Sequence, residues 1–221
     1  MSSMPEAMRH VMRDPRSKTL EDPLSLVTRL ASRFRTLWMS WTYPFASVGG
    51  EFRAHYTCDL RRSIAPYVRI GDSVRLDRDV WVNIPVLPGT NEPVIVFDEG
   101  CKVGKRCMIS AKNRIHFERN VVLAPSVLVM DHNHAFENVN VPIKSQGITP
   151  GGTIRIEEGC RVGFGAAIVC GKGELVIGKN SVIGPNAVVS RSVPPNSVVA
   201  GNPGQLVNDL LVNDLPAADA R

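Results

Sequence analysis

The chain has 221 residues, of which 43% are hydrophobic, and a formal net charge of +5 at pH 7. A chain of this size can bury a continuous core, and no apolar run reaches the ~18 residues that a membrane-spanning helix requires. The excess charge lies in residues 1 to 69, which hold 11 Lys and Arg against 6 Asp and Glu, whereas residues 70 to 221 hold 15 of each. A folded body without net charge argues against a nucleic-acid-binding protein.

The first twenty residues are polar and lack periodicity, which predicts a mobile tail. They also lack the apolar core of a signal peptide, so we expect a cytoplasmic protein. The five cysteines agree with this expectation, because none has the C-x-x-C spacing of a metal or redox site. We expect them to be packed free thiols.

An amphipathic helix is predicted from Leu24 to Trp41, where large apolar residues recur at spacings of three and four. Pro44 ends the pattern. We expect this helix to pack its apolar stripe on the end of the following domain as a cap. The alternative is a peripheral membrane anchor, because aromatic residues beside arginines suit an anionic lipid surface. The stripe consists of Leu24, Val27, Leu30, Phe34, Leu37, Trp38 and Trp41.

A period of six residues begins at Ile70 and continues through most of the remaining chain. It slips by two residues between Ile109 and Phe117, which indicates a bulge at a corner that leaves the core undisturbed. The apolar positions of this part are Ile70, Leu76, Val82, Phe97, Val103, Ile109, Phe117, Leu123 and Val129.

The period stops at Met130 and resumes near Ile154. A long insertion in a compact repeat is usually functional. This one begins with the sequence D-H-N-H at Asp131 to His134. Histidine is the side chain whose ordinary pKa best suits a general base near pH 7. We therefore place the chemistry in this insertion.

The clearest repeat lies between Ile156 and Val193. Neither a helix nor an ordinary strand buries every sixth residue, whereas short strands wound into a triangular coil do. The sequence therefore predicts an all-β solenoid built as a parallel β-helix. Branched residues recur at Ile156, Val162, Ile168, Ile177, Ile183 and Val189, with a compact residue four positions later at Cys160, Ala166, Ser181, Ala187 and Val193.

This pattern resembles the hexapeptide-repeat acyltransferases, whose fold is a left-handed parallel β-helix. The segment I-GPNAVVSRSVPPNSVVAGNP at Ile183 to Pro203 resembles the last coil and exit turn of acetyl-CoA-dependent sugar O-acetyltransferases. With D-H-N-H and P-I-K-S-Q-G at Pro142 to Gly147, it is most similar to the members that modify polysaccharides or lipopolysaccharides. The resemblance implies an N-terminal arm (1–66), a β-helix domain (67–207) with a catalytic loop (130–153), and a tail (208–221).

The resemblance also implies partners and residue roles. We expect acetyl-CoA as donor, a sugar or glycolipid as acceptor, no metal and a homotrimer. The catalytic base corresponds to His132, with His134 as the second candidate. Asp131 and Glu137 are candidates to orient the imidazole or hold the sugar, and Asn83 corresponds to a substrate-binding residue. The positions that match the pantetheine groove are Phe164, Pro185, Ser190 and Arg191.

Two alternatives belong to other classes. A γ-type carbonic anhydrase uses the same fold with three histidines on zinc, but the spacing of His132, His134 and His116 does not match its ligand pattern. A non-catalytic scaffold would need neither the D-H-N-H sequence nor the G-N-P exit turn. A metal assay and a thioester-release assay separate the three functions.

Overall fold

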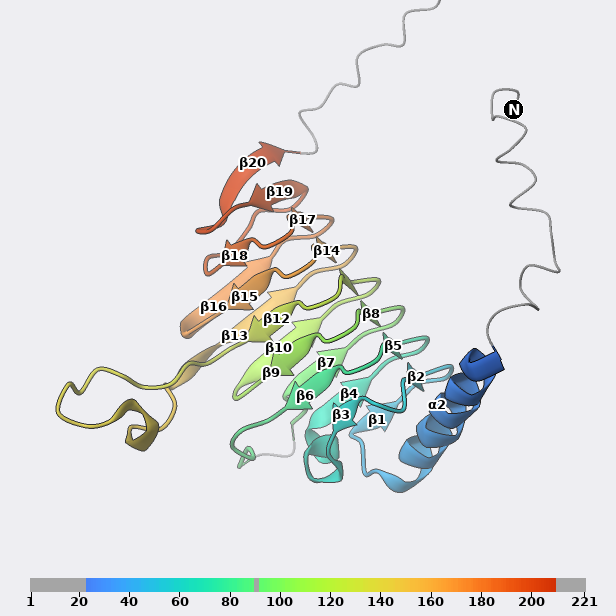
Figure 1. Cartoon of the computed structure of the whole chain (residues 1–221). Helices are drawn as coiled ribbons and strands as arrows, with labels where there is room; N and C mark the ends of the chain where they lie inside the picture. The colour runs from blue at the N-terminus through green and yellow to red at the C-terminus, as the bar shows by residue number, and fades with distance from the viewer. Residues whose placement is uncertain (1–22, 90–91, 210–221) are drawn as a thin grey trace, which may run out of the picture.

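The chain winds into a parallel β-helix, and the structure, a computed structural model, describes residues 23 to 89 and 92 to 209 (Figure 1). Successive strands join sheets A, B and C in turn, so that strands of neighbouring coils pair in parallel. The predicted all-β solenoid is therefore confirmed. The expected N-terminal tail lies outside the described residues, as does the chain after Asp209.

The strands are short, and each sheet collects one strand from every coil. Sheet A contains β1 (Ser47–Val48), β4 (Val68–Ile70), β7 (Ile95–Phe97), β10 (Arg114–Phe117), β13 (Gly151–Ile156) and β16 (Lys172–Ile177). Sheet B contains β2 (Arg53–Ala54), β5 (Arg75–Leu76), β8 (Lys102–Val103), β11 (Val122–Leu123), β14 (Arg161–Val162), β17 (Val182–Ile183), β19 (Ser197–Ala200) and the antiparallel β20 (Gln205–Asp209). Sheet C contains β3 (Asp59–Leu60), β6 (Trp81–Asn83), β9 (Met108–Ser110), β12 (Leu128–Met130), β15 (Ala167–Val169) and β18 (Val188–Val189).

The core is the interior of the triangular prism, and the hexapeptide positions fill it. All the apolar positions predicted between Ile70 and Val193 are buried, including the compact residues beside them. Phe97 and Phe117 stack on adjacent coils with ring centroids 4.9 Å apart. Burial of a large apolar side chain contributes about 1.5–3 kcal/mol, so a row of them stabilises each coil through its neighbours.

The three edges of the prism differ. The corners from sheet A to B and from B to C are four residues long in every coil. All of them except the corner 55–58 contain a residue in the left-handed backbone region, such as Gly100, Asn120 or Asn186, whose residue types tolerate that conformation. The corners from sheet C to A, here called the C–A edge, vary in length and contain the 3-10 helix η1 (Arg62–Tyr67) and the loop 131–150. All the long insertions therefore lie along one edge.

The first coil precedes the predicted start at Ile70, since β1, β2 and β3 cover residues 47 to 60. It keeps the period of six at Val48, Ala54 and Leu60. The large and compact positions are exchanged, however, because Ala54 occupies a large position and Phe52 a compact one, and both are buried. This exchange of volumes conceals the repeat in the sequence.

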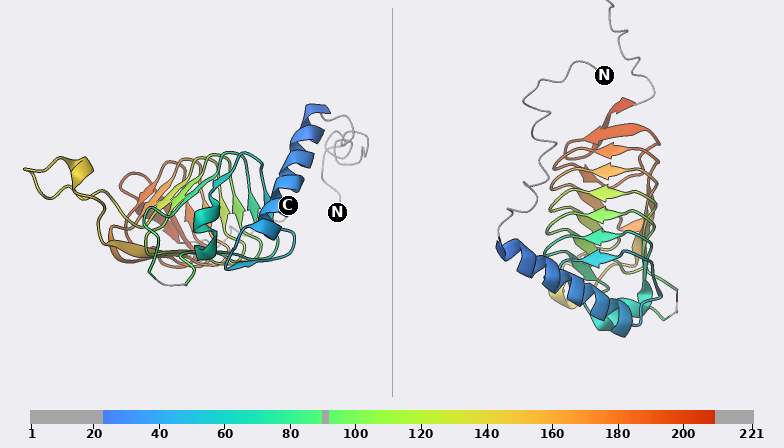
Figure 2. Two further views of the ribbon diagram at one scale, coloured as in Figure 1. Left: turned by 90° about the horizontal axis from the view of Figure 1, so that it is seen from below. Right: turned by 90° about the vertical axis from the view of Figure 1, so that its right-hand side faces the viewer.

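The predicted helix is α2 (Pro23–Thr42), which lies across the first coil beside β2 (Figure 2). The expectation that its apolar stripe packs on the coils is wrong, because Val27, Leu30, Phe34, Leu37, Trp38 and Trp41 are exposed. The residues that turn inward are Ser32, Arg35, Thr36 and Met39. No helix in the described ranges is long and apolar enough to cross a bilayer.

The polar face of α2 turns inward because the first coil has an unpaired strand edge. Thr36 Oγ1 accepts a hydrogen bond from the N–H of Ala54 and donates one to its carbonyl, at 3.0 and 3.1 Å. Arg35 donates to the carbonyl oxygens of Tyr56 and Cys58. Buried backbone groups need partners, so the helix caps the coil by hydrogen bonding rather than by apolar packing.

Candidate active site

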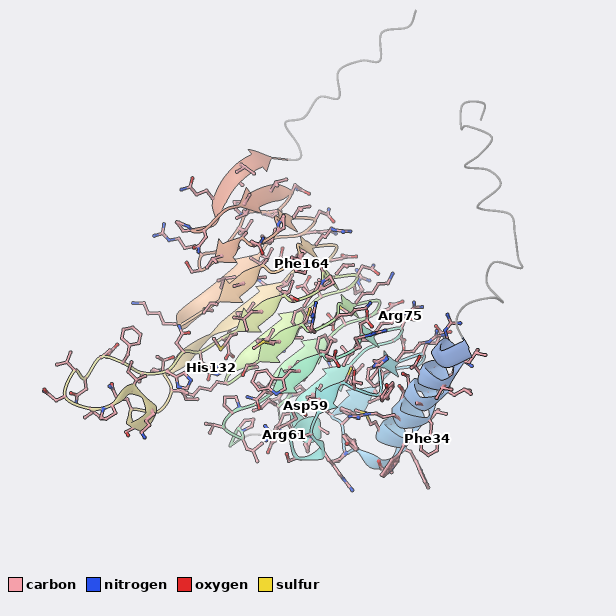
Figure 3. All side chains as sticks on the ribbon, viewed as in Figure 1. Phe34, Asp59, Arg61, Arg75, His132 and Phe164 are labelled. Atoms are coloured by element: carbon pink, nitrogen blue, oxygen red, sulfur yellow. The ribbon has the colours of Figure 1, made fainter. Side chains whose placement is uncertain are left out.

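His132 lies at the C–A edge, two residues after β12 ends (Figure 3). It is buried, and its Nδ1 lies 2.9 Å from Oδ1 of Asp131, which is completely buried. A carboxylate oxygen accepts, so Nδ1 carries the proton and Nε2 keeps its lone pair. The pair therefore presents an imidazole nitrogen that can accept a proton.

Three backbone N–H groups hold the Asp131 carboxylate. The N–H of Lys112 donates to Oδ1 at 2.7 Å, and those of Asn113 and Arg114 donate to Oδ2 at 2.8 and 2.9 Å. Lys112 and Asn113 lie in the corner where the period slips by two, and Arg114 begins β10 directly after it. The slip is therefore more than a tolerated bulge, because its extra residues provide the donors that fix Asp131. The slip is visible in the sequence, but its role in holding Asp131 was not predicted.

The loop 131–150 leaves the prism through a narrow stem. Asn133 and Thr149 bond twice across it, with the Asn133 N–H donating to Thr149 Oγ1 and the Thr149 N–H donating to the Asn133 carbonyl. His134, which is exposed, pairs with Ile148 in a single antiparallel bridge. The stem therefore holds His132 at the prism wall and places His134 outside it.

Gly151 closes the stem in a conformation that favours glycine, with φ of +81°. A Cβ at this position would lie 2.7 Å from the backbone oxygen of Asp131 and 3.4 Å from Cβ of His132. The close approach of these backbone segments explains why no larger residue fits here.

The outer part of the loop projects far from the prism (Figures 1 and 2). Gln146 ties it together through hydrogen bonds with Asn138 and Val141, close to the 3-10 helix η2 (Ile143–Ser145). Glu137 lies exposed on this part, whereas Asp131 is the carboxylate that contacts the imidazole. The loop also exposes three apolar side chains, namely Phe136, Val139 and Ile143.

Asn83 lies on the same edge as His132, at the end of β6. It is in register with Ser110 and, through β9, with Met130 directly before Asp131. Its Oδ1 accepts from Arg61 at 2.6 Å, and its Nδ2 donates to Ser110 Oγ at 3.3 Å. The edge therefore carries a row of hydrogen-bonding groups that leads to the histidine.

The residues expected to bind pantetheine fall on two edges. Phe164 and Pro185 lie on the B–C edge in adjacent coils, where the N–H of Asn186 donates to the Phe164 carbonyl. Ser190 and Arg191 follow β18 on the C–A edge, two coils beyond His132. All four are exposed, and Figure 3 shows His132 and Phe164 well separated. One chain thus brings together only part of the expected site.

The cysteines are all buried. Burial raises the pKa of the Cys58, Cys107 and Cys160 thiols to about 11 and that of Cys101 to about 12. Burial also raises the pKa of Cys170. A protonated thiol is a poor nucleophile, so these groups act as packing residues.

Within the described residues, no three His, Cys, Asp or Glu side chains are close enough together to hold a metal ion. His116 lies in β10 of sheet A, and its Nε2 is 2.8 Å from Oδ2 of Asp98. His116 and His132 therefore pair with different carboxylates, those of Asp98 and Asp131.

Known proteins share both the sequence and the fold. Over 147 residues the chain is 27% identical to Escherichia coli WbbJ, which is named as a lipopolysaccharide biosynthesis O-acetyl transferase, and this match covers 64% of the chain and 74% of WbbJ. Over 215 residues it is 24% identical to a Mycobacterium tuberculosis protein named as an acetyltransferase, a match that covers 90% of the chain and 66% of that protein. No protein-family model matches.

The fold agrees with these relatives. The Bacillus cereus N-acyltransferase AntD, solved with dTDP and 3-hydroxybutyryl-CoA, superposes with a TM-score of 0.63 at 14% identity, over 80% of the chain and 88% of AntD. The chain is thus similar in sequence to proteins named as acetyltransferases, and it shares its fold with a solved acyltransferase. A further member of this fold is the acetyltransferase domain of Neisseria gonorrhoeae PglB, solved with acetyl coenzyme A, at a TM-score of 0.51 and 18% identity over 71% of the chain and 58% of that domain.

The chain carries the pair of His132 and Asp131 at the corner where the coils are interrupted. Its described residues at that corner add Ser110, the 112–114 donors and Gly151 to the residues predicted from the sequence. All of these additional residues make contacts between neighbouring coils.

Proposed function

We propose that this acyltransferase moves an acetyl group from acetyl-CoA to a hydroxyl of a sugar, with His132 as the general base. The observation that carries the proposal is the buried pair of His132 and Asp131, in which one ring nitrogen is bonded to the carboxylate and the other is left to accept a proton. A hydroxyl acceptor requires such a base, because an alcohol near pH 7 is almost wholly protonated.

The proposed reaction is a direct transfer. Nε2 of His132 takes the proton of the sugar hydroxyl while that oxygen attacks the thioester carbonyl. The C–S bond then breaks, and the proton passes from the imidazolium to the leaving CoA sulfur. Asp131 stabilises the imidazolium and fixes the ring, and a positioned base contributes about 10²–10⁴-fold. We propose that Asn83, on the same edge, helps to hold the sugar, and the second candidate base, His134, stands outside the pair.

We propose a homotrimer, and the outer face of sheet C supports it. From the second coil onward, the outward residues of this sheet stand in register as one apolar row, which Asp59 of β3 precedes, whereas sheets A and B carry charged residues along the equivalent rows. In a cyclic trimer with sheet C facing the axis, the C–A edge of one chain lies beside the B–C edge of the next. The apolar row is Trp81, Met108, Leu128, Ala167 and Val188.

This arrangement would complete the site. His132 from one chain would meet Phe164 and Pro185 of its neighbour, which we propose line the pantetheine arm. Ser190 and Arg191, on the same edge as His132, would contact the nucleotide end, where a guanidinium suits a phosphate. The exposed apolar residues of the loop 131–150 would then be covered by the neighbour.

The acceptor and location are also proposals. The similarity to WbbJ, named for lipopolysaccharide biosynthesis, supports a sugar of a polysaccharide or glycolipid on the cytoplasmic side. The outward apolar face of α2 supports a peripheral contact with that membrane, since Trp38 and Trp41 are 50% and 89% exposed. A lipid-linked acceptor would then be presented at the surface where the enzyme rests.

The test is the pair of variants His132→Ala and His134→Ala, assayed for release of CoA with the acceptor present. We expect His132→Ala to lower kcat about 100-fold or more at an unchanged KM for acetyl-CoA, because the base acts in the transition state. We expect His134→Ala to have a much smaller effect. Near-normal turnover of both variants would place the base elsewhere.

A further inference from the structure

A groove of about 800 Å³ lies between α2 and the outer face of sheet B, on the side of the molecule away from the loop 131–150 (Figure 2). The helix forms one wall, with Arg29 and Arg33 among the lining residues. The other wall is formed by β2, β5 and β8 of the first three coils. Neither the acyl-transfer chemistry nor the cap made by α2 uses this space.

The strand wall carries three positive charges in one row. Arg53, Arg75 and Lys102 occupy the same outward position on adjacent strands, so that each is the register partner of the next. Neighbouring strands are about 4.8 Å apart, and like charges placed directly opposite destabilise a sheet. All three are exposed. The row therefore costs stability in the absence of an anion.

The described residues do not neutralise this row. No hydrogen bond or ion pair within them involves the side chains of Arg33, Arg53, Arg75 or Lys102, and Asp77 is the one acidic residue among those that line the groove. Oδ1 of Asp77 accepts from the backbone N–H next to it.

Other basic residues on the coils do have partners. Arg69 pairs with Asp98, and Arg119 and Lys179 both pair with Glu158. Arg161 also lacks such a partner, but its register neighbours are Val122 and Val182, so three adjacent cations distinguish the row in the groove. Together with Arg33 of the facing helix, the row supplies the donors that phosphate oxygens accept most strongly.

We propose that the groove between α2 and sheet B is a binding site for phosphate or diphosphate groups. The row spans roughly two strand spacings, or about 10 Å, which suits one or two phosphates held by Arg75 at the centre. An extended polyanion such as a nucleic acid would need a longer basic surface, and sheet B continues with Val122 beyond Lys102. The proposal does not depend on acyl transfer.

Two sources share this phosphate chemistry. Leu37 belongs both to the groove and to the apolar outer face of α2, so a lipid headgroup could enter while the helix lies on the bilayer. A soluble diphosphate could enter directly. The two sources are distinguished by measuring binding of inorganic pyrophosphate and binding to vesicles of phosphatidylcholine with and without phosphatidylglycerol.

The experiment compares the full chain with Arg75→Gln and with Arg161→Gln. Arg161 is the matched control, because it is an exposed cation on the same face of sheet B but does not line the groove. Pyrophosphate should raise the melting temperature of the wild type and of Arg161→Gln, and Arg75→Gln should bind it roughly tenfold or more weakly. In the absence of ligand, Arg75→Gln should melt at an unchanged or higher temperature, since a repulsion is removed.

Each arm has a decisive result. Binding of pyrophosphate that depends on Arg75 supports a soluble source, and retention on phosphatidylglycerol vesicles that depends on Arg75 supports a lipid source. The proposal is overturned if neither probe distinguishes Arg75→Gln from Arg161→Gln. It is also overturned if Arg75→Gln melts lower without ligand, because the arginine would then be a structural residue.

Discussion

At the residue scale, the decisive contact is the one between Asp131 and the corner at 112–114. A carboxylate can accept from three backbone N–H groups and a histidine at once, whereas the amide of an asparagine presents two hydrogens on one side. The carboxylate therefore has two tasks, since it fixes the imidazole and also joins two coils.

We expect Asp131→Asn to lower both stability and turnover. At least one backbone N–H would lose its acceptor and face a donor instead, which costs about 1–3 kcal/mol. Thermal unfolding should show this loss, and kcat should fall while the KM for acetyl-CoA stays near its value. The informative comparison is Asp131→Asn against His132→Ala, because only the first should lower the melting temperature substantially. Equal melting temperatures would show that the carboxylate does not hold the corner.

The cysteines provide a second prediction at this scale. Their raised pKa values keep them protonated at pH 8, so a disulfide reagent should react slowly with the native protein. After unfolding, the same reagent should react readily with all five thiols. A rapid native reaction of one thiol would contradict the packing described for it.

The same shifts affect stability at alkaline pH. An unfolded thiol ionises near pH 9, whereas Cys58, Cys107 and Cys160 in the folded chain hold their protons to about 11. The stabilisation from the protonated thiols is therefore fully present below pH 9 and is lost as the pH rises from 9 toward 11. Denaturant midpoints measured across this range would test it.

At the element scale, α2 shows what the sequence pattern could and could not establish. Its spacing of apolar residues predicted a helix, and the helix exists. The same spacing did not reveal which side meets the coils, because that side is determined by the unpaired edge of β2. Thr36 and Arg35 satisfy that edge, and their role depends on a strand that the sequence had not identified.

The orientation of α2 can be tested by a pair of substitutions. Met39→Ala removes a side chain that is 1% exposed and should cost about 2–4 kcal/mol, since a cavity would remain. Phe34→Ser changes a side chain that is 71% exposed and should leave the free energy of unfolding nearly unchanged in the absence of lipid. The opposite ranking in denaturant titrations would mean that the apolar stripe faces the coils after all.

The coils were more predictable than the site. Six-residue spacing is a local property, so positions such as Ile156 and Val162 identify the fold without any knowledge of contacts. The contacts of Asp131 with residues 112–114 join positions that are 17 to 19 apart in the chain, and only the winding of the coils brings them together. The insertion at 131–150 indicated the position of the candidate site in the sequence. The slip at the previous corner was a second indication of the same position.

At the scale of the whole molecule, the proposed trimer predicts a mass of about 73 kDa in solution, three times the 24.2 kDa of one chain. Met108→Glu places a charge in the centre of the apolar row on sheet C and should shift light scattering toward the monomer and abolish activity. Val176→Glu makes the same kind of change on the outer face of sheet A and should leave the trimer intact. A fully active wild-type monomer would refute the shared site.

The concentration of insertions on one edge has a consequence for how the molecule folds. Two of the three edges keep corners of four residues, so almost every contact forms between segments separated by a single turn of the coil. Growth can then proceed from any coil to the next, with the loop 131–150 as the one long closure in its path. The entropic cost of closing a loop rises only with the logarithm of its length. The replacement of a three-residue corner by twenty residues therefore raises the free-energy barrier of that step by roughly 2 kcal/mol at most. The catalytic edge can therefore lengthen or change its sequence while the assembly route of the coils stays the same.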